Sequence, residues 1–158
     1  MASFSGIKSM LTYHTIEPAN VDELMVIEEA CHSHPWSKKT FQSCIGSRYF
    51  GNYAQDVTNQ TIGFYIGDYI AGEVTLMDIC VIPEQQGKGY GKILLQHFLQ
   101  QAKQQNAEKV FLEVRAKNIT AQMLYMNHGF IETGRRTGYY PSNKGFGYED
   151  AIVMSLIL

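Results

Sequence analysis

The sequence predicts an α/β fold in which helices cover a mixed β-sheet, and three observations lead to this class. Two segments with apolar residues at helical spacing open the chain, and three segments rich in aromatic and β-branched residues follow them. A glycine-rich turn and a third helical segment then connect two strand segments. Such a strand–helix–strand crossover makes its two strands parallel, so we expect one parallel pair inside an otherwise antiparallel sheet.

The composition describes one folded domain of ordinary size. The chain has 158 residues, of which 45% are hydrophobic and 18% charged, and this excludes a disordered or fibrous protein. With a formal charge of -2, the chain does not have the net positive charge that is typical of proteins that bind nucleic acid non-specifically. We therefore expect no direct nucleic-acid partner. No apolar run approaches the roughly 18 residues of a membrane span, and the first residues lack the apolar stretch of a secretion signal. We therefore expect a soluble, cytoplasmic protein without membrane contact, with residues 1–9 as a flexible leader and residues 10–158 as a single domain.

Two capped helices are predicted at the start of the domain. Asn20, followed three residues later by Glu23, forms a capping-box pattern, and apolar residues at helical spacing extend the helix over residues 21–31. After a break at a proline, Ser37 can cap a second, short helix that ends near residue 46.

Six strands and two more helices complete the predicted order, ααβββαβαββ. The strands are expected at residues 49–54, 61–71, 73–82, 109–114, 130–133 and 150–158. Short turns join the first three into an antiparallel meander, and a long polar and aromatic loop joins the last two. The later helices are expected at residues 93–105 and after Asn118, which can cap a helix that ends near residue 128.

The most informative segment is the turn of residues 81–92, where Gly87, Gly89 and Gly91 occupy alternate positions. Without Cβ atoms there, backbone N–H groups at the start of the next helix can approach an anion such as a phosphate. Neither lysine of the turn precedes Ser or Thr, and no G-x-G-x-x-G stands here, which excludes a Walker loop and a Rossmann turn. The spacing alone leaves two interpretations open, a phosphate cradle and a tight loop that only needs glycine.

Gln86-x-x-Gly89-x-Gly91, between a strand and a helix, resembles the acetyl-CoA pyrophosphate loop of the GNAT family of N-acetyltransferases. Within that family, longer motifs resemble the bacterial ribosomal-protein-alanine N-acetyltransferases. These motifs are His34-Pro35-Trp36-Ser37, Leu112-Glu113-Val114-Arg115-Ala116-x-Asn118, Leu124-Tyr125-x-x-x-Gly129-Phe130, Arg135-Arg136 with Tyr139-Tyr140-Pro141, and Glu149-Asp150-Ala151. The resemblance runs from about residue 10 to residue 158. It implies the GNAT fold, a mixed sheet of six to seven strands flanked by about four helices.

The same resemblance implies acetyl-CoA as co-substrate and a set of residues that bind it. Backbone groups of one strand hold the thioester carbonyl where the sheet splays, the glycine turn holds the pyrophosphate, and a helix cap adds a further contact. In this chain the residues are Ile79, Cys80, Val81, Gln86, Gly87, Lys88, Gly89, Tyr90, Gly91, Lys92 and Asn118. For Asn118 the alternative is a helix cap and nothing more.

Two residues are candidates for the acid–base chemistry of acetyl transfer. Strand alternation places Glu113 opposite the apolar side chains of its strand, where a carboxylate can take a proton from an amine; its alternative role is an ion pair at the strand end. Helical spacing places Tyr125 on one face with Asn118, although a core aromatic would fit as well. The resemblance assigns the base to Glu113 and the acid for the CoA thiolate to Tyr125.

The resemblance also implies an acceptor groove and a substrate. The groove residues are Trp36, Tyr139, Tyr140, Glu149 and Asp150. The expected acceptor is the N-terminal alanine of a small-subunit ribosomal protein, and contact with a tRNA-modification assembly is a further expectation. The alternatives are a lysine side chain or a small polyamine as acceptor, and a module that binds acyl-CoA without turnover.

The chain departs from the family pattern in its last loop and at two positions of one strand. The loop Thr137 to Tyr148 is a few residues longer than the pattern, and Asp78 and Cys80 replace an uncharged polar residue and an alanine. Cys80 has no histidine beside it in sequence and the other cysteines have no obvious activating partner, so we expect direct transfer rather than an acetyl-cysteine. We find no histidine paired with a carboxylate at helical spacing and therefore expect no metal.

Overall fold

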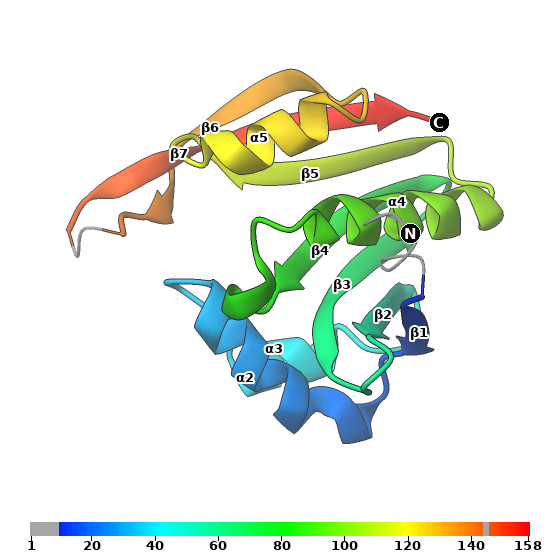
Figure 1. Cartoon of the computed structure of the whole chain (residues 1–158). Coiled ribbons are helices and arrows are strands. Elements are labelled where there is room, and N and C mark those ends of the chain that lie inside the picture. Colours follow the sequence, from blue (N-terminus) through cyan, green and yellow to red (C-terminus); the bar gives the residue numbers. More distant parts are fainter. Residues whose placement is uncertain (1–9, 144–145) are drawn as a thin grey trace.

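The computed structural model describes residues 10–143 and 146–158, and the predicted leader of residues 1–9 lies outside them. One seven-stranded sheet runs in the order β1-β2-β3-β4-β5-β7-β6 (Figure 1). Its strands are β1 (Thr12–Thr15), β2 (Tyr49–Gln55), β3 (Thr61–Ile70), β4 (Glu73–Val81), β5 (Lys109–Arg115), β6 (Ile131–Pro141) and β7 (Tyr148–Ile157). Only β4 and β5 pair in parallel among these strands, which confirms the mixed α/β sheet and the predicted crossover.

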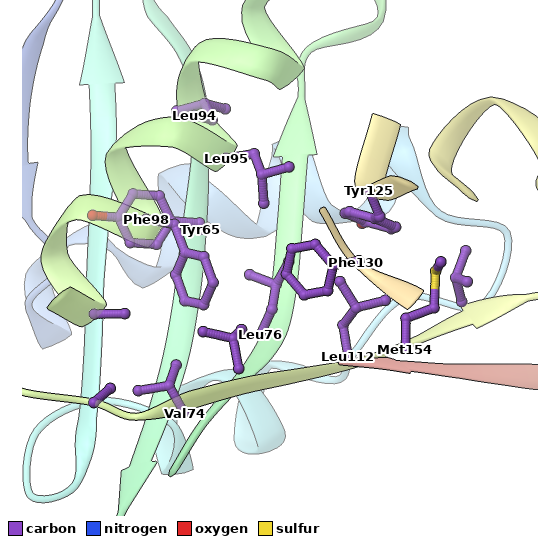
Figure 2. Close-up of a cluster of buried hydrophobic side chains, with 14 of the residues drawn as sticks. Tyr65, Val74, Leu76, Leu94, Leu95, Phe98, Leu112, Tyr125, Phe130 and Met154 are labelled. Carbon is purple, nitrogen blue, oxygen red and sulfur yellow. The ribbon is translucent and has the colours of Figure 1, made fainter. Parts of the chain in front are cut away.

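Helices cover both faces of this sheet. They are α2 (Val21–Cys31), α3 (Lys38–Ser43), α4 (Tyr90–Gln104) and α5 (Ile119–Met126), with short 3-10 turns η1 (Pro18–Asn20) and η2 (Pro83–Gln85). Successive residues of β3 are buried on opposite sides, Phe64 against α2 and α3 and Tyr65 against α4. Figure 2 shows the second of these cores, which joins α4 and α5 to both halves of the sheet. No helix within the described residues is long and apolar enough to cross a membrane.

One strand was not predicted and two predicted boundaries are wrong, because exposed strands and turns lack a hydrophobic pattern. The strand that was not predicted is β1, a short edge strand with no fully buried residue. Strand β6 was predicted to end at residue 133, whereas it continues through the loop to Pro141 with almost every residue exposed. Helix α4 begins at Tyr90 rather than residue 93, because the glycine turn itself leads directly into its first turn.

Two of the three predicted helix caps are confirmed. The Ser37 hydroxyl accepts a hydrogen bond from the Thr40 N–H, and the Asn118 side chain accepts one from the Ala121 N–H. The predicted Asn20 cap is wrong, because the Asn20 side chain instead accepts from the Glu17 N–H and closes the preceding turn η1.

The sheet separates between β4 and β5, where the sequence analysis expected a splay. These two strands pair only through three residue pairs, from Glu73 with Lys109 to Thr75 with Phe111. Just beyond them the register of β4 on β3 jumps, which leaves Met77 as an extra bulged residue. From there β4 stays with β3 and β5 stays with β7, so a space opens between the two strands (Figure 1).

Candidate active site

A groove of about 940 Å³ occupies the space between the separated strands. Its walls come from five parts of the chain. They are the end of α2, the outer part of β4 (residues 76–81), the glycine turn with the start of α4, the end of β5, and α5. The fold therefore brings residues that lie far apart in the sequence to one cleft.

The glycine turn forms one end of the groove. Gly87 and Gly89 have positive φ angles of 76° and 87°, which L side chains rarely adopt, so both glycines are needed for the turn itself. Gly89 is the N-cap of the 15-residue helix α4 and has no side chain to cap it. The backbone N–H groups of the first helical turn, together with the helix dipole, make this end suited to an anion such as a pyrophosphate.

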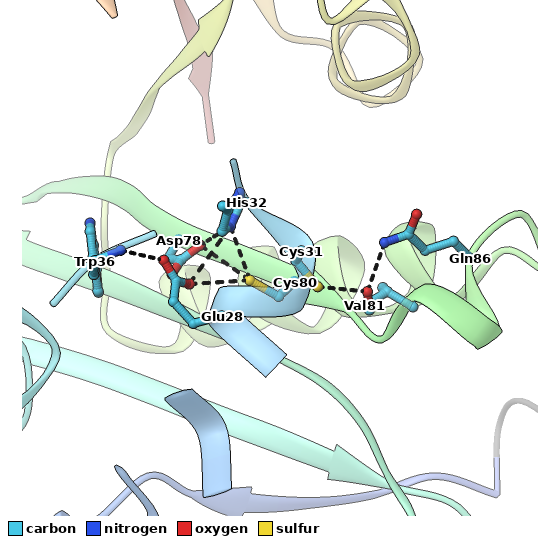
Figure 3. A network of polar contacts seen from close by, with 8 residues as sticks. All are labelled: Glu28, Cys31, His32, Trp36, Asp78, Cys80, Val81 and Gln86. Atoms are coloured by element: carbon cyan, nitrogen blue, oxygen red, sulfur yellow. Dashed lines mark hydrogen bonds and ion pairs between the residues drawn. The ribbon is translucent and has the colours of Figure 1, made fainter. Parts of the chain in front are cut away.

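The outer part of β4 forms the floor and turns a row of backbone groups toward the groove. The Val81 carbonyl accepts hydrogen bonds from the Gln86 side chain at 2.9 Å and from the Cys31 thiol at 3.0 Å, so it faces away from β3 (Figure 3). Since backbone groups of successive strand residues point to alternate edges, Ile79 shares this orientation and Cys80 faces β3 instead. Ile79 and Val81 are thus the residues whose backbone can hold a ligand, whereas Cys80 offers only its side chain.

Glu113 lies on the opposite wall, on β5. Its neighbours along the strand are buried on the other face, as the alternation predicted. The carboxylate forms an ion pair with Arg136 of β6, with Oε1 3.0 Å from Nε, and its side chain is 25% exposed. A partly exposed carboxylate in a groove can accept a proton from an amine that enters there.

Tyr125 and Asn118 come from α5. Tyr125 is buried and packs edge-to-face on Phe130, and burial raises the pKa of its phenol. None of the residues that the structure describes bonds to its hydroxyl, which leaves this proton donor available on the groove wall. Asn118 caps the helix and also lines the groove, so the cap and a ligand contact are compatible. Gln122 fixes the helix start by donating to the carbonyls of Arg115 and Ala116.

The predicted acceptor residues divide into two groups. Trp36 and Tyr140 line the groove, and the Arg115 guanidinium lies over the Tyr140 ring at 4.5 Å. Glu149, by contrast, is buried outside the lining, where its carboxylate pairs with Arg115 at 3.0 Å. Glu149 therefore has a structural role, because its carboxylate holds the Arg115 guanidinium in place against the ring of Tyr140.

Most of the remaining predicted residues also line the groove. Those that line it are Ile79, Cys80, Val81, Gln86, Gly87, Gly89, Tyr90, Gly91 and Lys92. Three lie outside the lining. Lys88 is exposed and donates to Gln85, Tyr139 packs on Arg136, and Asp150 accepts from the Gly138 N–H.

A polar cluster at the inner end of the groove, three of whose four residues are buried and whose His32 side chain is 40% exposed, was not predicted from the sequence. It consists of Glu28 and His32 from α2 and Asp78 and Cys80 from β4 (Figure 3). Glu28 and His32 are four residues apart on one helix, so the statement that no histidine has such a carboxylate partner is wrong. Cys80, which has no histidine beside it in sequence, lies 3.1 Å from His32 Nε2 in space. The spacing of Glu28 and His32 within α2 can be recognised in the sequence. The packing of α2 against β4, which adds Asp78 and Cys80, cannot be recognised there.

The close contacts within the cluster shift the pKa values of all four of its side chains. Burial and a hydrogen bond with Asp78 raise the pKa of Glu28 to about 8, from an ordinary 4.5. Burial would raise the pKa of Asp78 as well, but hydrogen bonds from His32 and Glu28 outweigh it and lower the pKa. The hydrogen bond with Asp78 raises the pKa of His32, and burial raises that of the Cys80 thiol. These directions favour the protonated form of Glu28 and the ionised form of Asp78.

Comparison with known proteins agrees with the geometry of the groove. The model of the acetyltransferase (GNAT) family matches residues 21–130. The [ribosomal protein bS18]-alanine N-acetyltransferase of Escherichia coli K12 is 37% identical over 147 residues, covering 93% of this chain and 97% of the relative. The enzyme of the same name from Haemophilus influenzae is 39% identical over 143 residues, covering 90% and 96%. A crystal structure of the ribosomal-protein-S18-alanine N-acetyltransferase from Escherichia coli superposes with a TM-score of 0.88 at 36% identity, covering 94% of each chain.

Proposed function

Because the chain belongs to the GNAT family of acetyltransferases, we propose that it transfers the acetyl group of acetyl-CoA to the α-amine of an N-terminal alanine of a small-subunit ribosomal protein. Acetyl-CoA is the co-substrate of GNAT acetyltransferases. The choice of acceptor is supported by relatives named for alanine acetylation of ribosomal protein bS18, which match this chain over nearly its full length. The observation that carries the mechanism is that Glu113 and Tyr125 line the same groove from two different elements.

The donor enters from the glycine-turn end. Its pyrophosphate binds at the start of α4, and the thioester lies along the outer part of β4. The Ile79 and Val81 backbone faces this space, so an N–H group there can stabilise the negative charge that develops on the carbonyl oxygen. For Val81 this requires no change in the strand, because its N–H already points away from β3.

Glu113 acts as the base on the acceptor side. The α-ammonium group, whose pKa is about 8, loses a proton to Glu113 directly or through a water molecule. The neutral nitrogen then attacks the carbonyl carbon of the thioester, and the bond between that carbon and sulfur breaks. An α-amine suits an unassisted carboxylate better than a lysine side chain, whose pKa is about 10.4.

Tyr125 completes the reaction by giving its phenolic proton to the departing CoA thiolate. Its raised pKa keeps the phenol protonated at neutral pH until the thiolate forms. The acceptor chain leaves the groove past Trp36 and Tyr140, which form the aromatic rim. Transfer is direct, without an acetyl group on the enzyme.

Mass spectrometry of peptides incubated with the purified protein and acetyl-CoA tests this proposal. One peptide begins with a free alanine and continues with basic ribosomal sequence, and its twin has a blocked N-terminus and the same lysines. Acetylation confined to the free alanine supports the proposal. Acetylation of the blocked twin would assign the enzyme to lysine chemistry, and no acetylation of either would overturn the peptide acceptor.

A further inference from the structure

The polar cluster of the buried Glu28, Asp78 and Cys80 with the partly exposed His32 has no part in the transfer described above, yet it assembles four metal-ligating groups. One ligand atom from each residue lies within 4.8 Å of all the others. Two come from α2 and two from β4, so the cluster is formed only by the folded chain.

Five of the six separations between these atoms are close to the edges of a small coordination tetrahedron. Typical zinc bond lengths of about 2.0 Å to N or O and 2.3 Å to S imply ligand–ligand separations of about 3.3 to 3.6 Å. His32 Nε2 lies 3.0 Å from Asp78 Oδ1, 3.1 Å from Cys80 Sγ and 3.7 Å from Glu28 Oε1. Cys80 Sγ lies 3.4 Å from both carboxylate oxygens. These five separations lie within a few tenths of an ångström of those in a coordination shell, and the sixth, between the Glu28 and Asp78 oxygens, is no more than 4.8 Å.

The direction of the histidine argues for a coordination site rather than a proton relay. In a relay a histidine uses one ring nitrogen for the nucleophile and the other for the carboxylate. Here the same nitrogen, His32 Nε2, faces the thiol and both carboxylates, although one N–H can donate well to only one of them. The geometry is that of several ligands around one point.

The second carboxylate oxygen of Asp78 is the further observation. When both carboxyl groups are ionised, Asp78 Oδ2 is buried without a hydrogen-bond partner in the described structure, and the Asp78 side chain is only 5% exposed. In the metal-free protein a proton on Glu28, which hydrogen-bonds to Asp78, relieves this. A cation bound through both oxygens of Asp78 would take the place of that proton.

We propose that Glu28, His32, Asp78 and Cys80 bind a Zn²⁺ ion that ties the last turn of α2 to the outer part of β4. An imidazole, a thiolate and two carboxylates form a mixed donor set that favours zinc over magnesium or calcium, which prefer oxygen ligands alone. The deprotonated set carries three negative charges, and a divalent cation neutralises most of this buried charge. The Trp36 N–H holds the other oxygen of Glu28 at 2.9 Å, which orients this ligand from outside the cluster.

Metal binding by the chelator-stripped full-length protein tests the site. Zn²⁺ affinity is measured by competition with a chromophoric chelator, and Co²⁺ serves as a spectroscopic probe of the thiolate. We expect one Zn²⁺ per chain, and with Co²⁺ a thiolate-to-metal charge-transfer band together with the visible bands of a tetrahedral ion. Cys80→Ser should abolish the charge-transfer band, and His32→Ala should weaken zinc binding by at least about 100-fold, the upper range for loss of an outer-shell partner.

Another cysteine of the chain provides a matched control. Cys44 is buried among apolar residues and lies outside the group of four. Cys44→Ser should retain both the affinity and the cobalt spectrum. Asp78→Asn keeps the size of the side chain and should still lose affinity, and circular dichroism without metal checks that each variant is folded. Zinc binding that is absent in the wild type, or equal in wild type, Cys80→Ser and His32→Ala, would overturn the proposal.

Discussion

The guanidinium of Arg136 on β6 reaches past β7 to the carboxylate of Glu113 on β5, with 3.0 Å between Nε and Oε1. The pair orients the carboxylate within the groove. Because both side chains are partly exposed, the pair adds little to the free energy of unfolding, at most about 1 kcal/mol. The main effect of this ion pair is to hold the Glu113 carboxylate in position.

Arg136→Ala should therefore reduce turnover far more than stability. We expect kcat to fall by about 10- to 100-fold, because a misplaced catalytic group costs rate even when the fold is intact. Steady-state kinetics and thermal unfolding measure the two effects. Arg135→Ala is the matched control, since Arg135 pairs with Glu132 and Asp150 and has no contact with Glu113. Equal losses of kcat in both variants would contradict a positioning role.

Glu113→Gln should lower kcat by about 100-fold or more at neutral pH while acetyl-CoA affinity stays unchanged. The deficit should shrink as the pH rises above about 8, because the α-amine then loses its proton without help. A kcat profile from pH 6 to pH 10 and calorimetric titration with acetyl-CoA separate these effects. A deficit that is the same at all pH values would exclude Glu113 as the base.

Tyr125→Phe removes only a hydroxyl that has no partner among the described residues, so the fold should be unaffected. We expect kcat to fall by about 100-fold because the thiolate loses its proton donor. The measurement is single-turnover acetyl transfer, with Tyr139→Phe as the control on the exposed strand β6. An unchanged rate in Tyr125→Phe would mean that solvent protonates the thiolate.

Alanine substitutions in the glycine turn distinguish a phosphate cradle from a turn that only needs glycine. A Cβ at Gly91 meets only Leu124 at an ordinary 3.8 Å, and alanine is the better helix former by about 1 kcal/mol. Gly91→Ala should therefore stabilise the protein and still weaken acetyl-CoA binding. Gly89→Ala, at a positive φ of 87°, should lower stability by about 1 to 2 kcal/mol and weaken binding too. Unimpaired acetyl-CoA binding in Gly91→Ala would support the purely structural interpretation.

Stability should depend on pH through Glu28. Its pKa of about 8 in the folded protein exceeds the ordinary 4.5, so between these values the native state binds the proton that the unfolded state has released. The free energy of unfolding therefore decreases as the pH rises through this window. Asp78 and His32 titrate in the same cluster, with stability from Asp78 lost at low pH and stability from His32 lost above its raised pKa.

The Glu28→Gln variant isolates the contribution of Glu28. It keeps an oxygen for the Trp36 N–H but cannot ionise, so its stability should decline less between about pH 5 and pH 8 than that of the wild type. Urea unfolding at several pH values with a chelator present gives the comparison. Parallel curves for the two proteins would show that Glu28 is already ionised in the native state.

The features that were predictable from sequence are those set by neighbours along the chain. Helix α2, the Ser37 and Asn118 caps, and the side of β5 on which Glu113 lies all follow from local spacing. The contact of Arg136 with Glu113 depends on the register of three strands, which no local pattern encodes.

The polar cluster was unpredictable for the same reason. Glu28 and Cys80 are 52 residues apart and meet only because α2 packs against the outer part of β4. The exposed strand β6 lacks the alternation that identifies a half-buried strand, so its length was visible only in three dimensions.

The early separation of β4 from β5 gives this protein unpaired strand edges in its interior, in addition to the edges that β1 and β6 form at the rim of the sheet. An exposed apolar edge invites pairing with another chain and aggregation, and proteins usually guard such edges with charge or proline. The edge at Ile79 and Val81 carries neither, and the Gln86 amide and the Cys31 thiol cover its Val81 carbonyl from within the same chain. Recessed in a groove, this edge can remain apolar and available to a small extended ligand without becoming a template for self-association.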